Sequence, residues 1–142
     1  MAIDNNFYYI DIVKIPIDVN IALNFVNDAA SGSTLLFNGT VRDNEDGTPV
    51  KFLYYEAYEE MAIKEIDKLI RAAFEKYDLN KIAVIHRTGK IEIGEISISI
   101  AVSSPHRDSS YTASKFLIDN IKETVPIWKK ESFGEYEKWK RI

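Results

Sequence analysis

Side chains that could do chemistry concentrate in four short segments of this 142-residue chain. The segment SSPHRD, residues 103–108, joins a regular strand pattern to the start of a helix pattern. Free backbone N–H groups and the positive end of a helix dipole would coincide there with His106 and Arg107, which suits an anion. A capping loop, in which Asp108 or Ser109 satisfies the helix start and His106 is merely exposed, is an equally weighted alternative.

Arginine also ends a strand pattern in the segment GTVR, residues 39–42. A guanidinium at Arg42 could bind a phosphate or carboxylate through two hydrogen bonds, although an arginine in water at a hairpin end is the more common case. The other His-Arg pair, His86-Arg87, has no helix start behind it. That setting favours a structural or solvated role for the pair.

Lysines mark the last two segments. Lys122 shares a helical stripe with Lys115 and Asp119, a spacing typical of a solvated face. In PIWKKE, residues 126–131, neighbouring side chains of an extended strand would face opposite sides, so Trp128 could wall a pocket into which Lys129 points. Alternatively, Trp128 fills the core and the lysines extend along its edge. Composition leaves both possibilities open.

Hydrophobic periodicity predicts the elements that must position these residues. Strands are expected over 7–14, 34–42, 50–58, 81–87, 95–103 and 127–131, and helices over 18–28, 59–77 and 108–124. Turn-forming residues at 43–48 predict that 34–42 and 50–58 form one long hairpin. Clean alternation over 95–103 predicts a half-buried strand. The order predicts an α+β fold with a mostly antiparallel sheet and packed helices, in a single domain over residues 1–142.

Composition excludes several classes of function. The 18 basic and 22 acidic residues give a net charge of −4, which argues against a general nucleic-acid or membrane-surface binder. The absence of cysteine excludes disulfides, thiolate metal sites and a cysteine nucleophile, and two histidines make a multi-histidine metal site unexpected. Neither a signal-peptide pattern nor an apolar run of about 18 residues is present, so we expect a cytoplasmic protein. The residues alone predict an anion pocket but name no reaction.

The ordered motifs FNGTVRD, YYEAYEEMA, VIHRTGKIEIGE, SSPHRDSSYTA and VPIWKKE resemble the large, catalytic subunit family of molybdopterin synthase, from about residue 34 to residue 131. The resemblance implies an α/β hammerhead-like fold. It also implies conversion of cyclic pyranopterin monophosphate to molybdopterin, the ligand of the molybdenum cofactor. Two sulfur atoms would come from the C-terminal Gly-Gly thiocarboxylate of a small β-grasp subunit. The implied assembly is a homodimer within a heterotetramer, without a metal or other cofactor.

The resemblance also assigns residues by position. It implies catalytic roles for Lys122 and Lys129, which reverses the solvated-face interpretation of Lys122. Lys122 would lie nearest the thiocarboxylate and act in acyl-type transfer, while Lys129 would bind substrate or shuttle protons. Clustered cations would lower the pKa of such a lysine. The substrate-binding residues it implies are Arg42, His106, Arg107, Phe37, Lys130 and Glu131.

Two other classes of function stay open beside the synthase. One is a non-catalytic module that binds the tail of a ubiquitin-like partner, and the other is a cyclic-phosphate hydrolase with His106 as general acid. The sequence departs from the family at Tyr111, where phenylalanine is common, and in its short C-terminus. The presence of both lysines within the complete set of ordered motifs favours the synthase.

Overall fold

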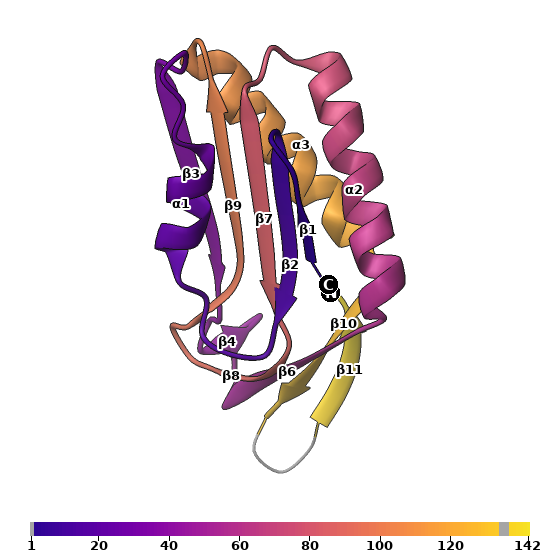
Figure 1. The fold of residues 1–142 in the computed structure, drawn as a ribbon. Coiled ribbons are helices and arrows are strands. Elements are labelled where there is room, and N and C mark those ends of the chain that lie inside the picture. The colour runs from indigo at the N-terminus through magenta and orange to yellow at the C-terminus, as the bar shows by residue number, and fades with distance from the viewer. Residues whose placement is uncertain (1, 134–136) are drawn as a thin grey trace.

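A five-stranded sheet forms the centre of the computed structural model, which describes residues 2–133 and 137–142 (Figure 1). Its pairs are antiparallel except for the two strands β2 and β7. The spatial order is β1 (Ala2–Asp4), β2 (Tyr8–Val13), β7 (Lys81–Arg87), β9 (Ile96–Ser104) and β3 (Ser33–Thr40). The predicted α+β class with mostly antiparallel pairing is therefore confirmed.

A second sheet of four antiparallel strands lies at the foot of the first (Figure 1). Its order is β11 (Glu137–Arg141), β10 (Ile127–Ser132), β6 (Phe52–Ala57) and β8 (Gly89–Glu92). The expected long hairpin is wrong, because β3 pairs with β9 whereas β6 pairs with β10 and β8. The turn-forming residues instead make a small hairpin of their own, β4 (Asn44–Glu45) with β5 (Thr48–Pro49). Between β3 and β6 the chain thus passes from one sheet to the other.

Helices cover both faces of the five-stranded sheet (Figure 1). On one face lies α1 (Val19–Val26), which begins after Asp18; the Asp18 side chain accepts a hydrogen bond from the Asn20 backbone N–H at 3.0 Å. On the other face lie α2 (Glu59–Lys76) and α3 (Arg107–Thr124). Their apolar stripes, which include Ile66, Ile70, Leu117 and Ile121, are fully buried.

Strand β9 is buried on both faces, so the prediction of a half-buried strand is wrong. Ser99 and Ala101, expected on the solvent side, are 0% exposed. The reason is α1, whose Ala22 and Val26 pack against Ala101 on that side of the sheet. Ser99 satisfies its hydroxyl by donating to Asn38 Oδ1 at 2.6 Å. Central strands covered on both faces are a rigid platform for a site.

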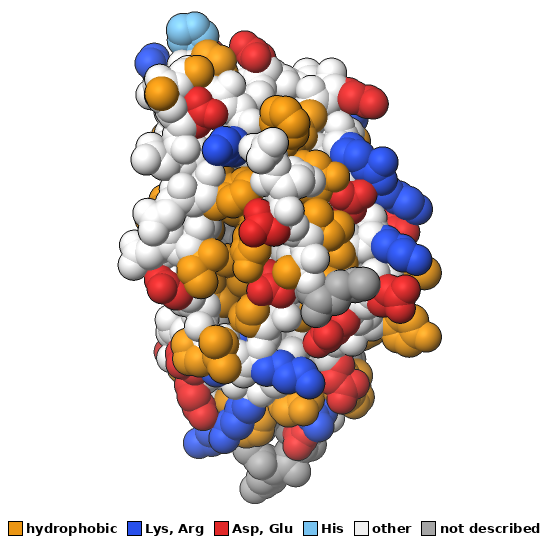
Figure 2. Space-filling model, viewed as in Figure 1, with side chains coloured by type: hydrophobic (Ala, Val, Ile, Leu, Met, Phe, Trp, Pro, Cys, Tyr) orange, Lys and Arg blue, Asp and Glu red, His pale blue; other side chains and the backbone are white. Residues whose placement is uncertain are grey.

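Charged side chains of both signs alternate along the outer face of α2 (Figure 2). Ion pairs one turn apart, such as Lys64–Glu60 at 3.8 Å and Arg71–Asp67 at 2.7 Å, match the spacing of helix neighbours. The α2 surface is therefore the solvated face that its sequence pattern predicts.

None of the helices that the structure describes is long and apolar enough to cross a membrane.

Candidate active site

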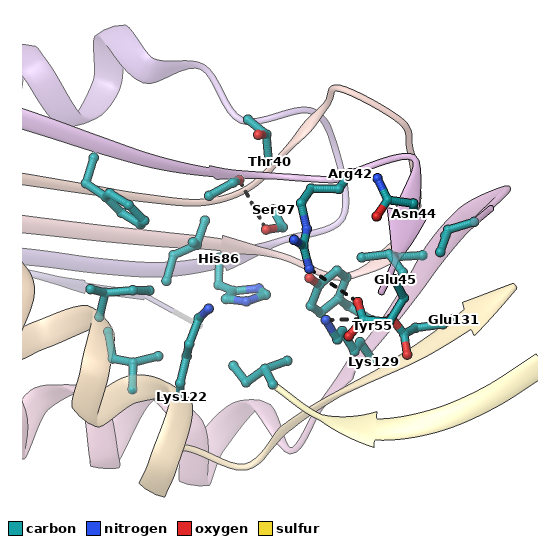
Figure 3. Close-up of a pocket in the computed structure, with 18 residues that line it drawn as sticks. Thr40, Arg42, Asn44, Glu45, Tyr55, His86, Ser97, Lys122, Lys129 and Glu131 are labelled. Carbon is teal, nitrogen blue, oxygen red and sulfur yellow. Dashed lines mark hydrogen bonds and ion pairs between the residues drawn. The ribbon is translucent and has the colours of Figure 1, made fainter. Parts of the chain in front are cut away.

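A cavity of about 390 Å³ opens where the two sheets meet the C-terminal end of α3 (Figure 3). Its volume lies in the range of sites that hold small molecules. Apolar side chains from β3, β6, β9 and α3 form part of its wall. The polar side chains that line it are Thr40, Arg42, Asn44, Glu45, Tyr55, His86, Ser97, Lys122, Lys129 and Glu131.

The two predicted catalytic lysines line this cavity from different elements. Lys122 stands in the last turn of α3, and the chain then turns at Val125 into β10, which carries Lys129. Burial is the main cause that lowers the pKa of Lys129, and the charges of Lys140 and Lys122 lower it further. The expected direction of the lysine shift is thus present, but desolvation contributes more than the clustered cations.

Alternation along β10 decides which lysine enters the cavity. Lys129 lines it, whereas Lys130 does not. The Lys130 ammonium instead pairs with Glu137 at 3.0 Å and lies 5.2 Å from the centre of the Trp139 ring. Trp128, at 38% exposed, neither walls the cavity nor fills the core. A substrate contact by Lys130 has no support from this geometry.

Two carboxylates lie beside Lys129. Glu131 is 2% exposed, and its Oε2 is 4.0 Å from the Lys129 Nζ. Glu45 accepts a hydrogen bond from Lys140 at 2.8 Å, and the same ammonium is 3.9 Å from Glu131 Oε1. Burial raises the pKa of Glu131, while the hydrogen bond from Lys140 lowers the pKa of Glu45. These acids partly balance the positive charge of the cavity.

Phe37 lies in strand β3, and Arg42 follows two residues after the end of that strand. Both residues line the cavity. The β3–β9 register shifts between Gly39 and Thr40, just before Arg42. The Arg42 side chain is 70% exposed and lies 3.4 Å from Glu45 Oε2. Its guanidinium therefore stands at the mouth of the cavity, where one N–H group donates to Glu45 and the others can donate to an incoming anion.

His86 is a cavity residue that the sequence interpretation did not place there. It is 2% exposed, and its ring packs edge-on against Tyr55 with 5.2 Å between the ring centres. The signal that could have found it is the strand period, because His86 shares a face with Ile82 and Val84, which belong to the core on the α2 and α3 side. That face runs directly into the cavity.

His106 and Arg107 lie elsewhere in the chain. They border a separate hollow with Gly32, Pro105 and Asp108 at the start of α3. Lys122 is 15 residues further along the same helix, about 22 Å away at the usual rise per residue. A single chain therefore does not bring this pair to the lysines, and its role in substrate binding stays a prediction. His106 is also the N-cap residue, without a capping side-chain hydrogen bond.

Fold and cavity together define an α+β protein with a cavity that is lined by three cationic side chains, Arg42, Lys122 and Lys129. The family model described as MoaE protein matches residues 12–124, and the chain belongs to this family. It is 45% identical to the molybdopterin synthase catalytic subunit of Dictyostelium discoideum, over 93% of this chain and 86% of that protein. The namesake of Drosophila persimilis is 43% identical over 93% of this chain, which covers 37% of that longer protein.

A solved structure supports the same relationship. The molybdopterin synthase of Staphylococcus aureus superimposes with a TM-score of 0.89 at 36% identity, over 96% of this chain and 98% of that chain. The fold expected from the motifs is therefore confirmed.

Proposed function

We propose that this chain is the cytoplasmic catalytic subunit of a molybdopterin synthase, which converts cyclic pyranopterin monophosphate to molybdopterin. The observation that carries the proposal is the convergence of Lys122 and Lys129 in one cavity with Arg42 at its mouth. The similarity of the chain to proteins named molybdopterin synthase catalytic subunit supports it.

Each cavity residue has a proposed role that follows from its position. Arg42 binds the cyclic phosphate, because a guanidinium can donate two hydrogen bonds to phosphate oxygens. Phe37 forms part of the apolar wall against the flat pterin. Burial lowers the pKa of Lys129, and this lysine binds substrate or shuttles protons. Lys122 acts nearest the thiocarboxylate in acyl-type transfer.

The proposed sulfur donor is a small β-grasp subunit with a C-terminal Gly-Gly thiocarboxylate. Its tail would enter the cavity, where the positive groups Lys122, Lys129 and Arg42 suit an anionic end group. The relatives are named catalytic subunits, which supports the presence of a further subunit. Glu131 would hold Lys129 in place while the tail is absent.

We further propose a homodimer at the centre of the assembly. His106 and Arg107 lie at the far end of α3 from the cavity of their own chain. If they bind the same substrate as Arg42, a second copy of the chain must supply them. Mixing two inactive variants, Arg107→Ala and Lys122→Ala, tests this directly, since heterodimers would regain one intact composite site.

The experiment that tests the function is reconstitution. The purified chain is mixed with cyclic pyranopterin monophosphate and a thiocarboxylated small subunit, and molybdopterin is detected as its fluorescent oxidised derivative. We expect product with the thiocarboxylate and none with the matched subunit that ends in a plain carboxylate. Association of the subunits without turnover would support a tail-binding module instead. Substrate hydrolysis without a sulfur donor would support a phosphohydrolase, although His106 lies outside this cavity.

A further inference from the structure

His86 is a buried titratable side chain of the cavity to which the proposed reaction gives no role. It stands in β7, opposite Ile12 of β2 and Ile98 of β9. Backbone pairing on both sides and 2% exposure of the side chain fix its place. The imidazole is therefore part of a rigid wall, which is where a positioning group is most precise.

Hydrogen bonding sets the tautomer of His86. Its Nδ1 lies 2.8 Å from the carbonyl oxygen of Arg87. A carbonyl only accepts, so Nδ1 carries the proton and donates it. Burial lowers the pKa of His86 to about 4, and the ring is therefore neutral at neutral pH. A neutral imidazole protonated on Nδ1 has an Nε2 that can only accept a hydrogen bond.

Within residues 2–133 and 137–142, the His86 Nε2 accepts no hydrogen bond. The Lys122 ammonium has no ion-pair partner in the same residues. Both side chains line the same cavity, and Figure 3 shows the Lys122 amine directed toward the imidazole. The Tyr55 ring makes a T-shaped contact with the imidazole and limits its rotation. An unused acceptor and an unused donor thus share one part of the cavity wall.

We propose that His86 is a positioning residue whose Nε2 accepts a hydrogen bond from the Lys122 amine and holds it in the reactive geometry. No hydrogen bond joins the two groups in this structure, and the flexible four-carbon stem of lysine lets the amine close the gap. A carboxylate in this place would favour the charged ammonium, whereas a neutral acceptor orients the amine without doing so. A neutral imidazole therefore suits a lysine that acts as base or nucleophile.

This inference rests on the proposed function. The kinetic test therefore compares each His86 variant with the wild-type chain, whose turnover tests the function itself. His86→Phe keeps a planar ring without the acceptor, and His86→Gln supplies an amide oxygen instead. In single-turnover sulfur transfer at saturating substrate, we expect His86→Phe to slow the rate by about tenfold or more with the substrate Kd unchanged. His86→Gln should recover part of the rate. An unchanged rate in folded His86→Phe, or a raised Kd with an unchanged rate, would overturn the proposal.

Nitrogen NMR of histidine-labelled chain tests the hydrogen bond without turnover. We expect an unprotonated Nε2 at neutral pH, and its resonance should move in Lys122→Ala, measured with and without cyclic pyranopterin monophosphate. Lys115→Ala is the matched control, because Lys115 lies on the same helix and pairs with Asp119 at 2.6 Å. A protonated Nε2, or a resonance insensitive to Lys122→Ala, would contradict the inference. A wild-type chain that makes no product would count against the proposed function alone, because this measurement needs no turnover.

Discussion

Lys129 and Tyr55 are direct cross-strand partners in the second sheet, and both side chains line the cavity. This pairing directs the Lys129 side chain, and not that of its neighbour Lys130, into the cavity. Because side chains alternate along a strand, a shift of register by one residue would turn Lys130 inward and Lys129 out. The β6–β10 pairing is therefore as important to the site as the lysine itself.

Arg42→Ala should weaken substrate binding. A charge-assisted hydrogen bond contributes about 1.5–3 kcal/mol, so we expect the Kd for cyclic pyranopterin monophosphate to rise about 10- to 100-fold. Arg42→Lys should retain part of the affinity, because it keeps the charge but loses the two-pronged geometry. Calorimetry measures both, with Arg71→Ala on the outer face of α2 as the control. An unchanged Kd in Arg42→Ala would remove Arg42 from the substrate site.

Glu131→Gln should lower the pKa of Lys129 further. The Glu131 carboxylate favours the charged ammonium, so removing its charge makes the proton easier to lose. If a neutral Lys129 is required, the acidic limb of the pH–rate profile should move to lower pH. Glu137→Gln is the matched control, since Glu137 pairs with Lys130 on the outer face. A limb that stays in place, or moves to higher pH, would contradict this coupling.

His86 should make the protein sensitive to mild acid. The folded pKa of about 4 lies below the ordinary 6.5, so the unfolded chain binds the proton more readily. The stability contributed by neutral His86 is complete above pH 6.5 and is lost as pH falls toward 4. The loss amounts to about 3 kcal/mol at most.

Denaturant unfolding between pH 7.5 and pH 4 measures this effect. His86→Phe should show a shallower fall in the free energy of unfolding than the wild type, whatever its stability at pH 7.5. Parallel curves for the two proteins would show that His86 does not resist protonation in the folded state.

Gly32→Ala should destabilise the junction that leads into α3. A Cβ at Gly32 would lie 2.5 Å from the Pro105 carbonyl oxygen, and a backbone atom cannot move aside alone. The Gly32 N–H also donates to the Ser104 and Pro105 carbonyls at 3.1 and 3.2 Å. We expect a loss of about 1–3 kcal/mol in the free energy of unfolding. Ala29→Ser, at an exposed position nearby, should change little; an equally stable Gly32→Ala would contradict the close approach.

Local patterns predicted the three helices and six of the strands, but they missed the strands β1, β8 and β11 and predicted strand partners less well. The stripes of α2 and α3 follow directly from helical spacing, and the extended form of residues 127–131 from its composition and Pro126. The hairpin between 34–42 and 50–58 failed because turn chemistry fixes a reversal of the chain but not which distant strand completes the pairing. Which strands pair depends on contacts between residues that are far apart in the sequence.

Lys122 shows the same limit within the site. The predicted stripe is solvated over the two turns before Lys122, where Lys115 pairs with Asp119 on an exposed face. Lys122 differs because β10 returns beside it and the second sheet closes the cavity. The helical spacing of residues cannot show that a distant strand packs beside Lys122. Only the resemblance to a family identified Lys122 as a site residue.

The central claim is that both cavity lysines serve sulfur transfer, and a three-variant turnover assay tests it most directly. Lys122→Ala, Lys129→Ala and Lys130→Ala are each reconstituted with thiocarboxylated small subunit and cyclic pyranopterin monophosphate, after circular dichroism has shown that each variant is folded. We predict losses of about 100-fold or more for Lys122→Ala and Lys129→Ala. Lys130→Ala, which removes a lysine from the outer face of the same strand, should stay close to wild type. Folded cavity variants that keep full turnover would contradict the account.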